Sequence, residues 1–313
     1  GHPFVIGTAA NGSVYSTGVT YQLDGASVTY SAYTSGYSSA TTRKLIITVP
    51  ASAPQLYYWC SIHSGMGGAI NTNTTLGSSN FAGSIQSTVK ANTTAGFSIV
   101  SYTGTGADGT VGHGLGVTPS AIFLKNRDRS VDWIVKHKSA TSGYILYLNQ
   151  NGVADGATGT NNGIIADLSS SSTFSITRTS NSGNYNNVGL NGEKVIAYCF
   201  SEVAGYSKFG SYTGNGNADG QFIFLGFRPA WFVVKRTDTS NNWRAFDAKR
   251  STFNEVDKRL YFDTSGAEST GSDIDFLSNG VKMRMTDNGM NASGGNYIYF
   301  SFAELPFKNS RAR

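Results

Sequence analysis

An internal repeat constrains the fold of this chain more than any other sequence feature. The segment Ser101–Gly109 (SYTGTGADG) recurs as Ser211–Gly220 (SYTGNGNADG). The register holds beyond these strings, because four unlike pairs lie at one constant offset of 110 residues: Tyr102 and Tyr212, Pro119 and Pro229, Lys125 and Lys235, Trp133 and Trp243. A period this long indicates duplicated whole domains rather than a solenoid of repeats of ~20 to 50 residues.

The composition predicts that these domains are all-β. Charged residues make up only 14% of the 313 residues, whereas Gly occurs 38 times, so few stretches could form the solvent face of a long helix. Nearly continuous apolar runs, Ala121–Lys125 and Trp231–Lys235, are typical of strands buried between two sheets. Polar residues alternate with apolar ones in Phe174–Thr177 and Val281–Met285, as expected of half-exposed strands.

Four segments follow from these patterns. We expect an N-terminal β domain at residues 1–70, a polar connector at 71–96, and two homologous β-sandwich domains at 97–206 and 207–313, for which a jelly roll is one candidate topology. Phe81, Ile85 and Val89 allow one short helix or strand in the connector. The chain opens at Gly1 without an initiator Met, and we expect it to begin inside the first domain.

The charge distribution and the hydropathy of the chain exclude some classes of partner. The net charge of +5 arises from scattered Lys and Arg residues with acidic neighbours, which argues against a nucleic-acid interface. Apolar stretches are far shorter than the ~20 residues of a membrane span, so no span is predicted. Cys60 and Cys199 are too few for a disulfide framework, so stability is expected to come from cores and subunit contacts.

The repeats resemble a known family. The strings Gly96–Gly106, Val111–Gly116, Gly205–Gly214, Phe227–Trp231 and Tyr297–Glu304, with Pro306 and Phe307, are similar to a duplicated domain of structural and tail-fibre-like proteins of marine tailed bacteriophages. The resemblance covers roughly residues 83–313 and implies a viral structural protein on the virion surface, as a tail fibre, a head fibre or a capsid decoration protein. Its implied partners are other virion proteins, a homo-oligomer that is a trimer if the protein is a fibre, and a host-surface glycan used in host attachment.

The N-terminal segment resembles the copper loop of cupredoxins. Cys60, His63 and Met66 have the spacing C-x-x-H-x-x-M, and His2 lies where that family places its first imidazole. A blue-copper site needs two imidazoles, one thiolate and a weak axial thioether, so copper is the implied cofactor. The separation of 58 positions from His2 to Cys60 requires a large insertion between strands. The alternative is that Cys60 and Met66 belong to a core and His63 to a turn.

The sequence gives less support to other kinds of functional site. Gly104, Gly106 and Gly109 imitate a dinucleotide loop, but β-type sequence follows them, which favours a turn. His113 and His137 are not retained by the duplication, since Asp247 stands at the position of His137. Glu202 and Glu304 end equivalent strands and are expected to be structural. We therefore predict no catalytic residue.

Four aromatic side chains are candidates for stacking on sugars: Trp133, Trp243, Tyr147 and Tyr261. The primary prediction is a virion structural protein that acts by assembly and glycan recognition. The alternatives are an extracellular copper-binding cupredoxin with appended adhesive domains and a glycan-cleaving tail enzyme.

Overall fold

The computed structural model describes residues 1–9, 11–50, 53–70, 77–141, 143–156, 164–165, 168, 170–177 and 188–305. The chain divides into two compact units, Gly1–Leu76 and Gly77–Arg313. The all-β prediction is confirmed, since strands dominate both units and the described residues include one short helix, α1 (Tyr30–Gly36). That helix is therefore too short to cross a membrane, and no other is present in the described ranges. Of the predicted sequence features, Pro306 and Phe307 lie outside those ranges.

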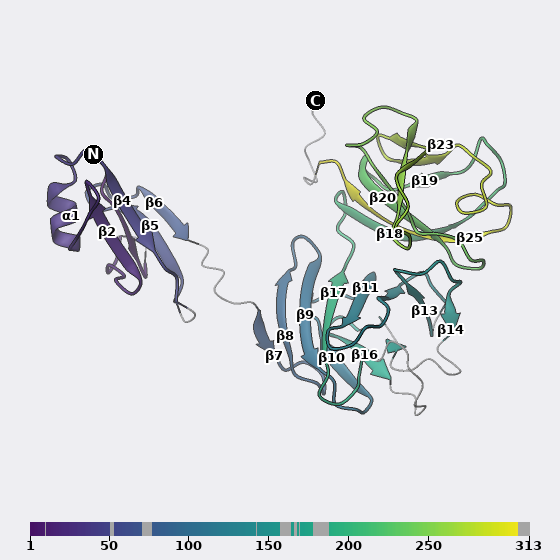
Figure 1. Cartoon of the computed structure of the whole chain (residues 1–313), viewed down its shortest axis with the longest axis horizontal. Helices are drawn as coiled ribbons and strands as arrows, with labels where there is room; N and C mark the ends of the chain where they lie inside the picture. Colours follow the sequence, from purple (N-terminus) through teal and green to yellow (C-terminus); the bar gives the residue numbers. More distant parts are fainter. Residues whose placement is uncertain are drawn as a thin grey trace. The chain divides into compact units, whose positions relative to one another are not determined.

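The first unit contains two three-stranded antiparallel sheets, in the orders β1-β5-β6 and β3-β2-β4. Its strands are β1 (Phe4–Gly7), β2 (Val19–Leu23), β3 (Ala26–Val28), β4 (Arg43–Ile47), β5 (Leu56–Cys60) and β6 (Gly67–Ile70). Helix α1 begins after Thr29, whose hydroxyl accepts a hydrogen bond from Ala32 N at 3.2 Å, and it contacts β2 through the rings of Tyr33 and Tyr21 (Figure 1).

The second unit contains both copies of the duplicated sequence; we call β7–β17 repeat 1 and β18–β25 repeat 2. Repeat 1 comprises β7 (Ser78–Asn80), β8 (Ser87–Asn92), β9 (Phe97–Thr103), β10 (Gly109–Gly112), β11 (Ala121–Asn126), β12 (Ile134–His137), β13 (Tyr144–Tyr147), β14 (Asp155–Gly156), β15 (Ile164–Ile165), β16 (Thr173–Thr177) and β17 (Lys194–Phe200). Repeat 2 comprises β18 (Ser207–Thr213), β19 (Phe222–Phe224), β20 (Pro229–Arg236), β21 (Arg244–Asp247), β22 (Val256–Tyr261), β23 (Ser269–Leu277), β24 (Gly280–Met283) and β25 (Asn296–Ala303).

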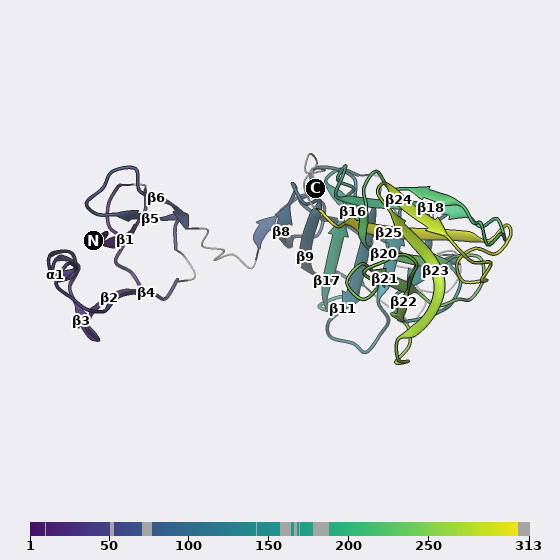
Figure 2. The same ribbon diagram turned by 90° about the horizontal axis from the view of Figure 1, so that it is seen from above.

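The two repeats share one strand order. Repeat 1 has β13-β12-β11-β17-β9 in its main sheet, and repeat 2 has β22-β21-β20-β25-β18, which are the equivalent strands in the same sequence of neighbours. Figure 2 shows β9, β17 and β11 side by side in repeat 1, and β20, β21 and β22 in repeat 2. The register agrees as well, since Tyr198 pairs with Ile99 in repeat 1 and Phe300 pairs with Phe209 in repeat 2. In repeat 1 a separate sheet, β10-β16-β15, covers the core, whereas in repeat 2 the equivalent strands continue the main sheet through β22 and β23.

Residues 77–96 belong to the second unit and not to a connector, although the short strand that the sequence allowed near Val89 is present as part of β8. Strands β7 and β8 pair with each other and β8 pairs with β9, so this stretch extends the main sheet of repeat 1. Ser87 and Val89 point into the core while Thr88 and Lys90 are exposed, which is the two-residue alternation of a strand. The many Asn, Thr and Ser residues hide this alternation in the sequence. Residues 71–76 lie outside the described ranges.

The described residues of the second unit form three hydrophobic cores. One fills the inside of each repeat, and Val100, Ile122 and Phe174 represent the first while Phe232, Phe276 and Met283 represent the second. The third lies between the repeats and we call it the interface core: Ala121, Val135, Leu146, Phe209, Val233, Trp243, Ala245, Ile298 and Phe300. Because β11 and β20 pack on a repeat core on one face and on the interface core on the other, the segments Ala121–Lys125 and Trp231–Lys235 are nearly continuous hydrophobic runs.

Candidate metal centre and other candidate sites

Three of the four predicted copper ligands meet at one end of the β1-β5-β6 sheet. His2 Nδ1 lies 3.0 Å from His63 Nδ1, and Cys60 Sγ lies 3.3 Å from His63 Nδ1 and 3.9 Å from His2 Nδ1. The imidazole rings are tilted, with their centroids 4.7 Å apart. Cys60 is buried, whereas both histidines are exposed. The thiol therefore lies beneath two imidazoles that face solvent.

Strand pairing brings these residues together. β1 pairs antiparallel with β5 so that Phe4 is opposite Cys60, which places His2, two residues earlier, beyond the Cys60 end of β5. Ser61 N donates a hydrogen bond to Pro3 O at 2.9 Å and continues this pairing past the strand end. β5 also pairs with β6, so His63 lies in the connection between two neighbouring strands. Two adjacent strands and one short loop therefore fix all three donors.

The loop that carries His63 is closed by its own backbone. Cys60 N donates to Met66 O at 2.9 Å, and Gly65 adopts a φ of +77°, which side-chain-bearing residues rarely adopt. Gly67 lies so close to β5 that a Cβ atom there would be 2.1 Å from Tyr58 O. A substitution at Gly67 would therefore move the loop away from the strand.

The long separation between His2 and Cys60 has a structural explanation. Between β1 and β5 the chain forms a complete second sheet, β3-β2-β4, together with α1. This is the large insertion that the resemblance requires.

The donor geometry fits a single metal ion. With metal–nitrogen bonds near 2.0 Å and metal–sulfur bonds near 2.3 Å, ligand atoms in a tetrahedral or trigonal shell lie about 3.3 to 3.8 Å apart. The three observed separations, 3.0, 3.3 and 3.9 Å, bracket that interval. Met66 lies in the same loop with a side chain that is 48% exposed, and its role as axial ligand stays a prediction.

The four aromatic glycan candidates occupy different environments. Trp243 is fully buried, and its indole Nε1 donates to Tyr147 O at 2.8 Å across the two repeats. The prediction that Trp243 contacts glycans is therefore wrong, because its ring belongs to the interface core. Trp133 is half-buried and stacks on Tyr198 at 6.1 Å, and Tyr261 is half-buried with its hydroxyl accepting from Arg259 Nε. The side chain of Tyr147 packs against the core of repeat 1.

The histidines of repeat 1 are buried and hydrogen-bonded. His137 Nε2 lies 3.2 Å from Tyr299 O of repeat 2, and its Nδ1 accepts from Ser139 N at 3.1 Å. Burial lowers the pKa of His137 to about 4, so the ring is neutral at pH 7. His113 is also fully buried, its Nδ1 accepts from Leu115 N, and burial lowers its pKa. Both rings therefore act as fixed hydrogen-bond partners.

The acidic candidates are paired with cations of the same unit. Glu202 contacts Lys138 at 2.7 Å and accepts from Phe209 N, and Glu304 contacts Arg228 at 3.1 Å. These pairings support the structural role predicted for both residues. In the glycine-rich turn Gly106 N donates to Gly189 O and strand β10 follows, which supports a turn rather than a dinucleotide loop.

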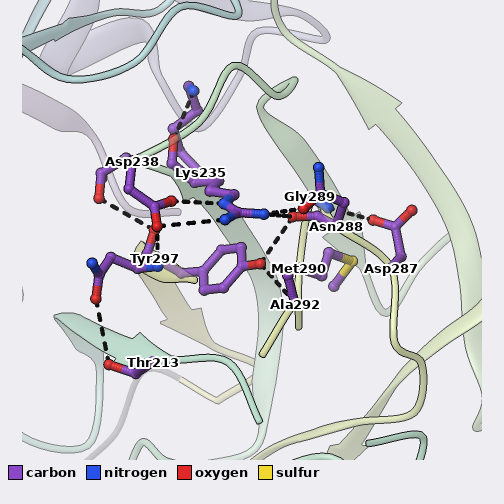
Figure 3. A network of polar contacts seen from close by, with 12 residues as sticks. Thr213, Lys235, Asp238, Asp287, Asn288, Gly289, Met290, Ala292 and Tyr297 are labelled. Carbon is purple, nitrogen blue, oxygen red and sulfur yellow. Dashed lines mark hydrogen bonds and ion pairs between the residues drawn. The ribbon is translucent and has the colours of Figure 1, made fainter. Parts of the chain in front are cut away.

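A dense polar network holds the 287–292 loop of repeat 2 (Figure 3). Arg236 donates to Asp238 Oδ1 at 2.6 Å and to Asn288 O at 3.0 Å, and Tyr297 OH donates to Asn288 O at 2.9 Å. The hydrogen bond to Asp238 raises the pKa of Arg236. Because the guanidinium and the carboxylate are directed at each other, the network favours anchoring of the loop over chemistry on a ligand.

Comparison with known protein families gives a match for the second unit. Residues 69–306 match a domain of unknown function, DUF7483. The chain belongs to this family. The match spans both repeats and begins within β6, so His2, Cys60 and His63 all precede it. Searches of curated proteins and of solved structures find no match.

Proposed function

We propose that the N-terminal unit is a copper-binding module of the cupredoxin kind. The observation that carries this proposal is the triangle of His2 Nδ1, His63 Nδ1 and Cys60 Sγ, with sides of 3.0, 3.3 and 3.9 Å. One thiolate and two imidazoles form the equatorial ligand set of a blue-copper site. The insertion between β1 and β5 supports the proposal, because it lets residues 58 positions apart lie on adjacent strands.

Each of the four candidate ligands would have its own role in such a site. Cys60 would supply the thiolate from a buried position, and His2 and His63 would close the solvent side of the ion. Met66, in the same loop as His63, would be the candidate for the thioether ligand. A bound copper ion would supply one-electron redox chemistry or link β1 to β5 as a structural staple. Zinc accepts the same donor types, so the choice of metal is part of the test.

The test is metal titration of the full chain under reducing conditions, followed by oxidation. Wild-type protein is expected to bind one equivalent of copper and to show a visible thiolate-to-copper charge-transfer band. Cys60→Ser should lose the band, while the matched control Cys199→Ala, which changes the other buried cysteine, should keep it. Met66→Leu should shift the band without abolishing binding. A wild-type chain that takes up no stoichiometric copper, or prefers zinc, would overturn the assignment.

We further propose that the whole chain is a structural protein of a tailed-phage virion, displayed on the head, collar or tail and therefore extracellular. The resemblance of residues 83–313 to structural proteins of tailed phages supports this proposal. In this proposal the chain acts by assembly and binding, not catalysis. Trp133 and Tyr261 remain the candidates for glycan contact.

Mass spectrometry of purified virions from a phage that encodes this chain tests the location. Peptides from both units are expected in stoichiometric amounts, and their absence from intact particles would refute the location. Incubation of the purified chain with host capsule or lipopolysaccharide tests the mode of action. We expect binding without release of fragments. Release of fragments would show that the chain cleaves glycans and would contradict the proposed mode of action.

A further inference from the structure

The repeats pack on each other through overlapping but offset parts of equivalent sheets. Among the buried members of the interface core, the equivalent strands β11 and β20, and β12 and β21, contribute in both repeats, whereas β13 contributes only in repeat 1 and β18 and β25 only in repeat 2. Repeat 1 contributes the β11-β12-β13 half of its outer face, with Ala121, Val135 and Leu146 in the interface core. Repeat 2 contributes mainly the β18-β25-β20-β21 part of its face, with Phe209, Val233, Trp243, Ala245, Ile298 and Phe300. An interface built from two different patches of related modules is head-to-tail rather than two-fold symmetric.

This offset leaves one part of each outer face without a buried residue in the interface core. We call this part the unused half: β9 and β17 in repeat 1, and β22 in repeat 2. In repeat 1 the positions equivalent to Phe209, Trp243, Ile298 and Phe300 are Ile99, Trp133, Ile196 and Tyr198, and all four are only half-buried. In repeat 2 the position equivalent to Leu146 is Leu260, which is 39% exposed whereas Leu146 is 1% exposed. Phe262, the counterpart of Leu148, is 37% exposed. In each repeat, the unused half therefore carries large apolar side chains at the same positions where the other repeat buries its side chains in the interface core.

The polar contacts across the interface also have unused counterparts. Trp243 Nε1 donates to Tyr147 O, and Lys235 Nζ donates to Asn151 O at 3.2 Å and to Gly152 O at 2.8 Å. Trp133 and Lys125 occupy the same outward positions in repeat 1, and there Lys125 Nζ instead contacts Val131 O. The hairpins that carry the acceptors are equivalent, since Leu148 N donates to Trp133 O and Phe262 N donates to Trp243 O. The Tyr261 carbonyl is thus the counterpart of the Tyr147 carbonyl.

We propose that a second copy of this chain covers the unused half of repeat 1 with the outer face of its own repeat 2 at β22. We call Ile99, Trp133, Ile196 and Tyr198 the acceptor face, and Leu260 and Phe262 the donor edge. Leu260 and Phe262 of one copy pack on Ile99, Ile196 and Tyr198 of the next, and the Trp133 indole donates to the neighbour's Tyr261 carbonyl. Each copy then has one open acceptor face and one open donor edge, so the association forms a closed ring or a filament. The proposal concerns the second unit only and does not depend on metal binding or on a virion location.

The test is the mass of the full chain in solution, measured by light scattering during size exclusion and by sedimentation over a concentration series. Wild-type protein is expected to associate beyond a monomer. Tyr198→Lys and Leu260→Lys, which place a charge on the acceptor face and on the donor edge respectively, should each abolish the association. The matched control Phe253→Lys changes an aromatic side chain that is 83% exposed outside both surfaces and should associate as wild type does.

A mixing experiment separates head-to-tail association from a symmetric contact. An equimolar mixture of Tyr198→Lys and Leu260→Lys chains retains one intact acceptor face and one intact donor edge, so it should form a capped one-to-one dimer. That dimer would also show that both variants are folded, and Ile196→Lys provides a second acceptor-face variant. Cys60→Ser should associate normally, which distinguishes this proposal from the copper site. A monomeric wild type, or variants that associate unchanged, would overturn the inference.

Discussion

Trp243 is fully buried between the repeats, whereas Trp133, its counterpart 110 residues earlier, is half-buried on the outer face of repeat 1. The same contrast separates Phe300 from Tyr198 and Phe209 from Ile99. The strand order and the register of these positions are the same in both repeats. The duplication therefore preserved the sheet, and packing against a neighbour decided which copy of each side chain is core.

His137 and Asp247 show how a contact can survive a change of residue. His137 Nδ1 accepts from Ser139 N, and Asp247 Oδ1 accepts from Lys249 N, in both cases two residues further along the chain. The acceptor that shapes the turn is thus present in both repeats. Asp247 makes its further contacts to Arg250 of its own repeat, whereas His137 contacts Tyr299 O of the other repeat. The sequence difference marks the residue that spans the interface.

The largest effect is expected at the paired tryptophans. Trp243→Ala removes a fully buried ring and the hydrogen bond to Tyr147 O, and should lower the free energy of unfolding by about 3 to 5 kcal/mol. Trp133→Ala, at the half-buried counterpart, should cost about 1 to 2 kcal/mol. Urea denaturation of dilute protein, followed by circular dichroism, measures both. Equal losses would show that the two environments do not differ as described.

A pH-dependent effect of intermediate size is expected from His137. Burial lowers its folded-state pKa from 6.5 to about 4, so the unfolded chain takes up this proton first as the pH falls. The stabilisation is complete above about pH 6.5 and is lost between pH 6.5 and 4, by about 3 kcal/mol in total.

His137→Gln keeps a donor and an acceptor but cannot titrate. The variant should therefore lose stability less steeply over that pH interval, as measured by urea denaturation at pH 7.5, 5.5 and 4.5. Some slope should remain, because burial also lowers the pKa of His113. Identical slopes in the variant and the wild type would show that His137 is already accessible to protons in the folded chain.

The smallest effect is expected at the matched glutamates. Glu202→Gln weakens a partly exposed ion pair with Lys138 at the junction of the repeats and should cost about 0.5 to 1 kcal/mol. Glu304→Gln, which weakens the pair with Arg228, should cost a similar amount. Both losses should shrink in high salt, since screening weakens exposed ion pairs. A loss that salt leaves unchanged would point instead to the hydrogen bond from Phe209 N.

Periodicity and the constant offset were sufficient to predict the all-β class and the equivalence of the repeats. The alternation of buried and exposed residues follows from strand geometry, and a duplicated sequence repeats it. The same reasoning allowed one short helix or strand near Val89 but did not predict that β7 and β8 extend the sheet, because the alternation at Ser87 and Val89 uses a small polar residue at an inward position. It also placed Trp243 among the surface candidates, since the sequence alone does not show whether a tryptophan lies on a buried or an exposed face of a sheet.

By itself, the sequence determined the class of the fold, the duplication and the identity of four metal-ligand candidates, because these depend on residue type and on spacing along the chain. Only the tertiary structure decided that His2 lies beside Cys60 and His63, since strand pairing joins residues 58 positions apart. It also decided which half of each repeat is buried. That choice depends on how two similar surfaces meet, and the free energy of burial is set by the neighbour as much as by the residue.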